Sequence, residues 1–460
     1  MDGEAEREGT QAVKELRADA LEIFEAGLAA VDGGESVRRA ISRKGGEVLI
    51  SALDAQVRVN LDEYERVLLV GGGKAGASMA EALVDALGEA AISAGAITVP
   101  LGSKQPDIPE RIEVFEATHP LPSDSAVEAV RRMVELAEGA IERDLIFFLL
   151  SGGGSAMLPL PAGDITLADK VEATKQLLAS GATIDEVNAI RKHISAIKGG
   201  QFLRAANPAR VISLIISDVI GDRLESVGSG PTVKNTTTFA DCVEIVRRYR
   251  LSRKLPASVL KRLRDGAHGK FSGPEDIEDA VFERCDNVVV SNNDVALAAC
   301  QGAAQSLGYS TVNLGARVFG EAREVAKVMV GIAQSAQARA YPASPPCCII
   351  SGGELTVTLT GDGLGGRNQE FALAAALHLR GTDSIVILSA GTDGIDGSSE
   401  AAGAIIDGKT TARGAYEGMD AADYLARSDS FSYLDAIGDT IITGRTGTNV
   451  MDIRLLMVDV

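Results

Sequence analysis

The segment Arg66–Gly76, RVLLVGGGKAG, decides how this chain of 460 residues should fold. It opens with a short apolar run rich in Val and Leu, which stops at three consecutive glycines. Met79, Leu83 and Leu87 then follow at helical spacing. The pattern predicts a buried strand, a glycine loop and a helix.

The same pattern returns twice further along the chain. Leu145–Leu150 runs into Ser151–Ser155 (SGGGS), and Cys347–Ile350 runs into Ser351–Glu354 (SGGE). Other apolar runs predict strands at residues 97–100, 112–117, 211–217, 288–292, 311–314, 355–360, 385–389, 440–443 and 453–458. Because these runs alternate with helical segments, we expect a mainly parallel α/β sheet.

The composition favours two domains with buried sheets. A chain of 460 residues is longer than the chains that usually fold around a single hydrophobic core. Only 4% of the residues are aromatic, whereas Gly numbers 50, so the apolar material is Ala, Val, Ile and Leu, as in a doubly wound sheet. Between Val246 and Ala280 the chain turns helical and basic and then polar, as in a solvated connector. We therefore predict one domain over residues 1–265 and another over 266–460.

Charge and targeting signals narrow the class of protein. The net charge of −19 opposes binding to nucleic acid or to anionic membranes. The N-terminus has no apolar run of the signal-peptide kind, and no stretch has membrane-spanning length, so we predict a cytoplasmic protein. We expect it to be a monomer or a homodimer. The five cysteines lack metal-binding spacing and read as buried free thiols.

Two glycine loops are the strongest candidates for binding phosphate. GGGKAG fits the G-x-G-x-x-G pattern, but the next strand ends at Val99–Gly102 without the acidic residue that a dinucleotide fold uses for ribose. Lys74 instead adds a positive charge to a loop whose backbone N–H groups favour an anion. A purely structural turn with an exposed lysine is the alternative. The expected nucleotide- and phosphate-binding residues are Gly71, Gly72, Gly73, Ser151, Gly152, Gly153, Gly154 and Ser155.

Other polar residues lie where chemistry is expected. Asp218 ends an apolar strand, where a carboxylate could accept a hydroxyl proton, hold magnesium or simply cap a helix. The stretch around Arg191 and Lys198 is cationic, and its His193 could be either a ligand or a packing residue. Arg367 opens a helix after a glycine loop, which suggests an anionic partner.

A series of motifs points to a family. In chain order they are GGGKA, THPLPSD, LLSGGGSA, IRKHISAIKGG, ISDVIGD, GSGPTV, GGRNQE, GTDGIDG and TGTNV. Together they resemble the class II glycerate 2-kinases from about Leu16 to the C-terminus, including the C-terminal domain named multi-organism fragment rich in leucine. Some members of that family are labelled hydroxypyruvate reductases.

The resemblance implies an ATP- and Mg²⁺-dependent transferase that converts D-glycerate to 2-phosphoglycerate. It also implies a larger Rossmann-like domain, a smaller C-terminal domain and an active site in the cleft between them. The family's loop lysine, strand-end aspartate and glycine-loop arginine fall on Lys74, Asp218 and Arg367, which we expect to be catalytic. Lys74, His193, Lys198 and Arg367 are the expected substrate-binding residues, and Asp218 and Asp393 the expected metal ligands.

Some positions depart from the family's motifs. They are Arg223, Gly228, the Gly397–Glu400 segment, Arg445 and Met451. The departures bear on fine substrate preference more than on the class of reaction. An NAD-dependent hydroxypyruvate reductase and a non-catalytic sensor of nucleotide or small acid are the alternatives.

Overall fold

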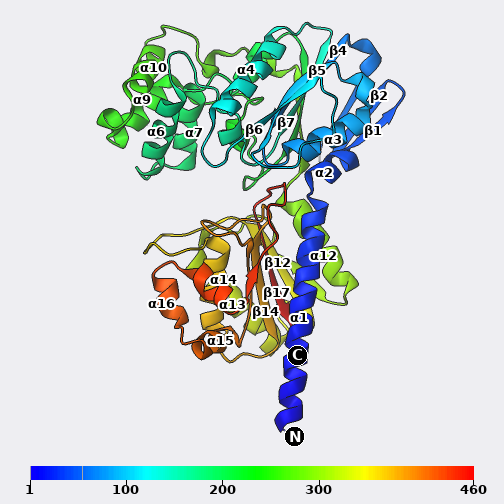
Figure 1. The fold of residues 1–460 in the computed structure, drawn as a ribbon, viewed down its shortest axis with the longest axis vertical. Coiled ribbons are helices and arrows are strands. Elements are labelled where there is room, and N and C mark those ends of the chain that lie inside the picture. The colour runs from blue at the N-terminus through cyan, green and yellow to red at the C-terminus, as the bar shows by residue number, and fades with distance from the viewer. Residues whose placement is uncertain (1, 54) are drawn as a thin grey trace. The chain divides into compact units, whose positions relative to one another are not determined.

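The computed structural model describes residues 2–53 and 55–460, with side chains from residue 11 onward. The chain forms two units, each built on its own sheet (Figure 1). We name Gly33–Ser291 the inserted unit, because it interrupts the other one in the sequence. Met1–Asp32 and Asn292–Val460 make up the discontinuous unit.

The inserted unit contains a six-stranded parallel sheet in the order β6-β5-β4-β7-β8-β9. Its strands are β4 (Arg66–Gly72), β5 (Ala94–Pro100), β6 (Ile112–Ala117), β7 (Asp144–Leu150), β8 (Arg210–Ile216) and β9 (Cys285–Ser291). The order runs outward from β4 in one direction and from β7 in the other, which is the Rossmann pattern with its switch point between these two strands. The predicted doubly wound parallel sheet is confirmed.

Helices cover both faces of this sheet. Alternate residues of a strand point to opposite faces, so Leu68 and Phe148 share one apolar cluster with α4 (Asp124–Glu138) and α8 (Gln201–Ala206). The helix α3 (Gly76–Leu87) contacts β4, β5 and β7, and none of its buried residues belongs to that cluster. The sheet is thus sandwiched, as the apolar strand sequences require.

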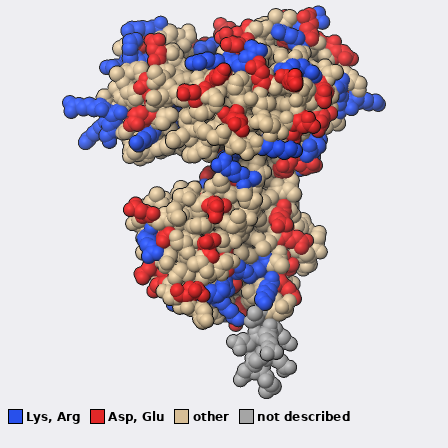
Figure 2. Space-filling model, viewed as in Figure 1, with Lys and Arg blue, Asp and Glu red and all other residues tan. Residues whose placement is uncertain are grey.

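Helical insertions follow β7 and β8. They comprise α5 (Gly154–Met157), α6 (Leu167–Leu178), α7 (Ile184–His193), α9 (Phe239–Arg248), α10 (Ala257–Ala267) and α11 (Asp279–Phe282). The arginines and lysines of α9 and α10 mostly face solvent, where Arg248 pairs with Glu186 and Lys261 with Asp265. Figure 2 shows basic and acidic side chains interspersed over the visible face of this unit. The predicted basic segment is therefore a solvated surface rather than an anion site.

A small antiparallel sheet precedes the large one in the inserted unit. After α2 (Gly33–Ala40), the strands β1 (Ile41–Lys44), β2 (Glu47–Ala52) and β3 (Ala55–Asn60) pair in sequence order. The sequence did not indicate these strands, because their burial alternates and leaves few apolar residues in a row.

The discontinuous unit has a mixed sheet in the order β10-β12-β17-β14-β15-β16. Its strands are β10 (Ser310–Asn313), β12 (Cys347–Gly353), β14 (Ile385–Gly391), β15 (Gly403–Asp407), β16 (Thr440–Ile441) and β17 (Asp452–Val458), and β11 (Gly320–Glu321) pairs separately with β13 (Leu355–Thr356). Among the six, β10 and β12 are the only neighbouring strands that pair in parallel, and every other neighbouring pair is antiparallel. The expectation of parallel strands is wrong here, because the last strand, β17, enters the middle of the sheet in the opposite direction.

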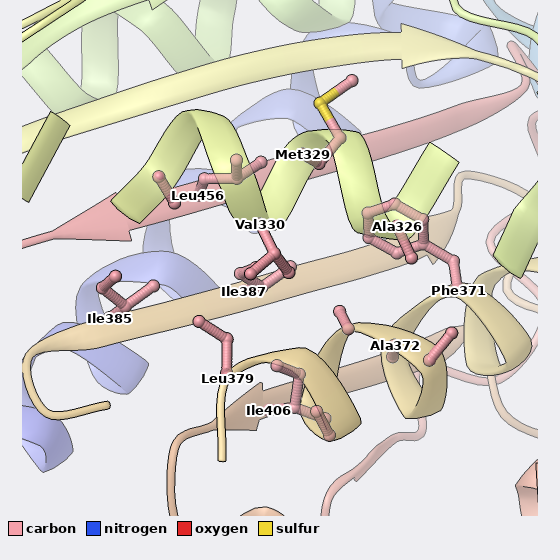
Figure 3. Close-up of a cluster of buried hydrophobic side chains, with 14 of the residues drawn as sticks. Ala326, Met329, Val330, Phe371, Ala372, Leu379, Ile385, Ile387, Ile406 and Leu456 are labelled. Atoms are coloured by element: carbon pink, nitrogen blue, oxygen red, sulfur yellow. The ribbon is translucent and has the colours of Figure 1, made fainter. Parts of the chain in front are cut away.

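Helices also cover both faces of the second sheet. On one face, α13 (Ala322–Arg339) and α14 (Arg367–His378) bury Val330, Phe371 and Leu379 against Ile387 and Leu456 (Figure 3). On the other face lie α1 (Asp2–Ala30) and α12 (Asn293–Ser306). The short helices α15 (Thr410–Tyr416), α16 (Ala421–Ala426) and α17 (Ser430–Ala436) complete the unit.

The boundaries of the two units differ from the domain boundary that we expected after residue 265. The strand β9 pairs with β8 and so completes the first sheet, although it lies beyond that boundary. At the other end, α1 packs against α12, β14 and β17. The basic segment that suggested a boundary lies within the helical insertion that precedes β9.

All five cysteines are free thiols, as expected. Four are buried, and Cys285 is partly buried. Burial raises the pKa of Cys300 to about 12, which keeps this thiol protonated and unreactive.

Candidate active site

The two glycine loops of the inserted unit meet at the switch point of its sheet. The backbone N–H of Lys74 donates to the carbonyl oxygen of Gly152 at 2.8 Å, and that of Ala75 donates to Oγ of Ser151 at 3.1 Å. Because β4 and β7 are neighbours, the loops at their carboxyl ends form one structure. This is where open α/β sheets bind their ligands.

Glycine is required for this close approach. Gly71 has a φ of 119°, and a Cβ there would lie 2.1 Å from the carbonyl oxygen of Leu149. Gly73 has a φ of 134°, and its Cβ would lie 2.3 Å from Oγ of Ser151. The glycines therefore serve both the backbone conformation and the contact between the loops.

Two side chains flank Gly153 in the second loop. A Cβ on Gly153 would lie 3.3 Å from Cγ of Lys74 and 3.2 Å from Cδ2 of His119. The side chain of Lys74 therefore lies against the second loop. His119 was not among the predicted site residues; the only sequence signal was its place in THPLPSD, directly after an apolar strand.

The second loop keeps backbone donors available. Among the described residues, the N–H groups of Gly152, Gly153 and Ser155 donate to no protein acceptor. Donors arranged in this way form the kind of concavity that binds phosphate oxygens. The group of available donors is smaller than the set of eight candidate residues, because Ser151 and Gly154, for example, use their N–H groups within the protein.

Asp218 lies at the same edge of the sheet, directly after β8, and is partly exposed. The described residues contain no group of three His, Cys, Asp or Glu side chains able to hold a metal. A single carboxylate fits magnesium, which keeps water and substrate phosphates as its other ligands. Asp393 lies in the other unit, where its Oδ1 accepts the N–H of Ile395 at 3.2 Å.

His193 is a packing residue, which corrects the expectation that it binds substrate. Its side chain is fully buried, and its ring nitrogens contact the carbonyl oxygen of Ala189 at 2.7 Å and Oε2 of Glu275 at 3.1 Å. The ring also packs edge-on against Phe239. Both nitrogens are occupied within the protein.

Lys198 is buried but lies beside the second glycine loop. Its Nζ donates to the carbonyl oxygen of Gly228 at 2.7 Å, and a Cβ on Gly154 would lie 3.5 Å from Cα of Gly228. Burial lowers the pKa of Lys198 well below its ordinary value, and the neighbouring Lys170 and Arg191 lower it further.

Arg367 opens α14 in the discontinuous unit, held by acidic side chains. Its Nε and Nη2 donate to the two oxygens of Asp452, each at 2.8 Å, and its Nη1 lies 3.1 Å from Oε1 of Glu354. Burial opposes the charge on Arg367, but Asp452 outweighs it and raises the pKa of the guanidinium. Asp452 thus occupies one edge of the guanidinium, and the prediction that Arg367 binds a substrate anion stays a prediction.

A second arginine supports this pair. Arg454 is fully buried, and its Nη2 lies 3.3 Å from Oδ2 of Asp452. Burial would raise the pKa of Asp452, but Arg367 and Arg454 outweigh it and hold that pKa below its ordinary value. Sequence reasoning missed Asp452 and Arg454; their signal was the presence of charges in the otherwise apolar strand DIRLLMV.

Asp396 explains the motif GGRNQE. Its two carboxylate oxygens accept the backbone N–H groups of Asn368 at 3.1 Å and Gln369 at 2.9 Å, which caps the first turn of α14. The carboxylate is fully buried, and burial raises its pKa to about 6. This aspartate of GTDGIDG is therefore a helix cap.

Some departures from the family's motifs have local explanations. Arg223 forms an ion pair with Asp185 of α7 at 2.6 Å. Gly228 has a φ of 55°, and a Cβ there would lie 2.8 Å from Leu150. Ser399 accepts a hydrogen bond from Nε2 of Gln369 at 2.6 Å. Nothing in the structure explains Arg445.

One surface pocket lies apart from these loops. It has a volume of about 440 Å³ and is lined by residues of α4, α8 and α10, including Glu138, Arg204 and Arg262. None of the predicted site residues lines it. No helix in the described part of the chain is both long and apolar enough to cross a membrane.

Comparisons with known proteins identify the family. Residues 19–264 match a domain of unknown function, DUF4147, and residues 347–452 match the MOFRL family. A D-glycerate 2-kinase of Thermotoga maritima is 35% identical, over 87% of this chain and 92% of its own. A protein of Agrobacterium vitis named putative hydroxypyruvate reductase is 43% identical, over 85% of this chain and 99% of its own.

A solved structure agrees with the sequence matches. The crystal structure of a glycerate kinase from Thermotoga maritima superposes with a TM-score of 0.82 and 32% identity, and the match covers 97% of this chain and all of that one. The fold, the joined glycine loops and the near full-length matches lead to one conclusion. The chain belongs to the glycerate kinase family.

Proposed function

We propose that this protein transfers the γ-phosphoryl group of ATP to the 2-hydroxyl of D-glycerate, giving 2-phosphoglycerate and ADP. The observation that carries the proposal is the pair of joined glycine loops beside Lys74 at the switch point of the sheet. Such a site suits phosphates, and the T. maritima relative is named a D-glycerate 2-kinase.

The loops would bind the nucleotide. The N–H groups of Gly152, Gly153 and Ser155 donate to phosphate oxygens, and the ammonium of Lys74 neutralises negative charge as it develops. Phosphoryl transfer depends mainly on positioning and electrostatics, so fixed donors and a cation supply most of what it needs.

Asp218 would serve the acceptor hydroxyl. Its carboxylate takes the proton as the hydroxyl oxygen bonds to the γ-phosphorus and the bond to the bridging oxygen of ADP breaks. Mg²⁺, which Asp218 and the phosphates would hold, would supply charge neutralisation at the transferring group. Asp393, in the other unit, stays a predicted metal ligand. Lys198 lies beside the loop and stays a predicted substrate-binding residue. Arg367, in the other unit, stays a predicted catalytic residue.

A coupled assay tests this proposal. Purified protein is incubated with ATP, Mg²⁺ and D-glycerate, and the product is read through enolase, which accepts 2-phosphoglycerate, in parallel with ADP release. We expect both signals. ADP without an enolase signal would contradict the position of transfer, and neither signal would contradict the activity.

Variants separate the roles. Lys74→Met and Asp218→Asn should each lower kcat at least about 100-fold. Lys104→Met and Asp164→Asn change exposed residues of the same kinds and are the matched controls. Normal turnover in Lys74→Met would exclude this lysine from the reaction.

The alternative, hydroxypyruvate reduction, has one specific support, which is the name of the A. vitis relative. Against it, β5 ends at Pro100 and Leu101 follows, so the second strand of the Rossmann order lacks the acid that holds a ribose. Oxidation of NADH or NADPH by hydroxypyruvate, followed by absorbance, would establish the alternative.

A further inference from the structure

Three neighbouring cationic side chains of the inserted unit form no ion pair with any described residue. They are Lys170 in α6, Arg191 in α7 and Lys198 before α8. Lys170 and Lys198 are 5% and 1% exposed, whereas Arg191 is partly buried. Buried charges are normally paired, so this arrangement needs an explanation.

Hydrogen bonding only partly satisfies these side chains. Nζ of Lys170 donates to the carbonyl oxygen of Pro159 at 2.8 Å, and Lys198 donates to Gly228. The guanidinium of Arg191 makes one long contact, 3.4 Å from Nη1 to Oδ1 of Asn188. Arg191 has five N–H donors, so most of its capacity is left for something other than protein.

The three cations repel one another. Burial and then the charge of Arg191 lower the pKa of Lys170 to about 7, and Lys198 is affected in the same direction by both neighbours. Burial alone lowers the pKa of Arg191. A nearby anion would relieve all three effects at once.

A polar path joins this group to the second glycine loop. Oδ1 of Asn188, which faces Arg191, accepts from Oγ of Ser229 at 3.4 Å, and that hydroxyl lies 3.2 Å from Oγ of Ser155. Ser155 belongs to α5, which the SGGGS loop opens. Arg191 is therefore linked through two side chains to the candidate phosphate site.

We propose that Arg191, supported by Lys170 and Lys198, binds an anionic group of the reactants beside Ser155. The chemistry fits a carboxylate or a phosphate, which a guanidinium can hold with two parallel hydrogen bonds. The proposal deepens the glycerate kinase activity proposed above and rests on it for the identity of the reactants. It adds to Lys74 a second cationic group in the inserted unit, a guanidinium supplied by the helical insertion.

Binding measurements on separate ligands test it without turnover. Calorimetry follows D-glycerate alone and ADP alone binding to the wild type, Arg191→Met and Arg191→Lys. We expect Arg191→Met to weaken one ligand at least tenfold and Arg191→Lys to recover part of that loss. Loss for D-glycerate assigns the site to the carboxylate, and loss for ADP assigns it to a phosphate. Unchanged affinity for both ligands overturns the proposal.

Stability distinguishes binding from a structural role. Arg191→Met removes an unpaired, partly buried charge and keeps an apolar stem, so its melting temperature without ligand should equal or exceed that of the wild type. A structural arginine would give a lower melting temperature, which would contradict the proposal. Arg253→Gln, at an exposed arginine of the same unit, is the control and should leave both binding and melting unchanged.

The wild-type protein provides an independent check. Inorganic phosphate should raise the melting temperature of the wild type more than that of Arg191→Met at equal ionic strength, and equal shifts would count against the site. If the wild type shows no kinase activity but this difference persists, the proposed function fails while the anion site stands. If turnover is present and the difference is absent, the anion site alone fails.

Discussion

Asp452 decides the position of Arg367 more than any other residue. It is fully buried between two arginines, and both of its oxygens accept hydrogen bonds from Arg367. Removing one partner of a buried ion pair leaves the other charge uncompensated. Asp452→Asn should therefore lower the free energy of unfolding by about 3 kcal/mol.

Urea unfolding measures this change, and Glu354→Gln is the matched variant. Glu354 contacts the same guanidinium, but 45% of its side chain is exposed. Solvent screens such a pair, so its loss should cost at most about 1 kcal/mol. Equal effects of the two variants would show that burial of Asp452 contributes nothing.

Asp396 should make stability depend on pH in weak acid. Its pKa is about 6 in the folded protein, whereas an unfolded aspartate titrates near about 3.9. Between these two pKa values the folded state binds more protons than the unfolded state. The stabilisation by protonated Asp396 is therefore fully present below the lower pKa and is lost as the pH rises through the higher one. The contribution is on the order of 3 kcal/mol.

Denaturant titrations at pH 4, 5, 6 and 7 check this for the wild type and for Asp396→Asn. The variant has no charge to bury, so its stability should rise relative to that of the wild type across the interval. A constant difference between the two proteins would mean that Asp396 titrates normally.

At the scale of elements, the joined glycine loops depend on backbone contact. Gly71→Ala would place a methyl group against the carbonyl of Leu149 on the neighbouring strand, which cannot move without breaking the sheet. We expect a loss of about 3 kcal/mol or more in the free energy of unfolding. Gly45→Ala is the control: Gly45 also has a positive φ, 64°, but a Cβ there meets nothing within 4 Å. A similar loss in both variants would attribute the effect to backbone strain alone.

The sequence predicted the elements that are continuously apolar and missed those that are not. Runs such as Leu145–Leu150 are buried along their whole length and were identified correctly. The small sheet β1–β3 was not predicted, because buried and exposed residues alternate along its strands. The direction of β17 could not be read at all, since a strand's sequence does not say which neighbour it will pair with.

The same limits apply to the site. Lys74 and the glycine loops were found because strand, loop and helix follow one another within a few residues. The Asp452–Arg367 ion pair joins residues that are 85 positions apart in the sequence. Arg191 is of interest only because it forms no ion pair with a described acidic residue. Neither property is visible before the chain is folded. His193 illustrates the reverse error, because a histidine in a cationic motif can belong to the core.

At the scale of the whole molecule, α1 belongs to the discontinuous unit, together with residues 292–460. Its Arg17 donates to Asp407 at 2.7 Å and to Asp439 at 2.8 Å, and Gly27 allows it to approach Cys300 of α12 closely. The fragment Gly33–Ser291 should therefore fold alone, whereas Asn292–Val460 should need α1.

Fragments test this directly. We expect Gly33–Ser291 to unfold cooperatively in urea, and Asn292–Val460 to gain cooperative unfolding only when a peptide of residues 1–32 is added. A peptide carrying Arg17→Ala should be less effective. Full stability of the second fragment without the peptide would show that α1 is dispensable.

The placement of α1 also sets an order of events during synthesis on the ribosome. The helix leaves the exit tunnel before the inserted unit, yet the strands and helices that cover it appear only after that unit. At ordinary rates of elongation this delay is on the order of tens of seconds. During that time the nascent chain displays an apolar helix face, next to a neighbour that can already fold, so α1 is the segment on which we expect a chaperone to act.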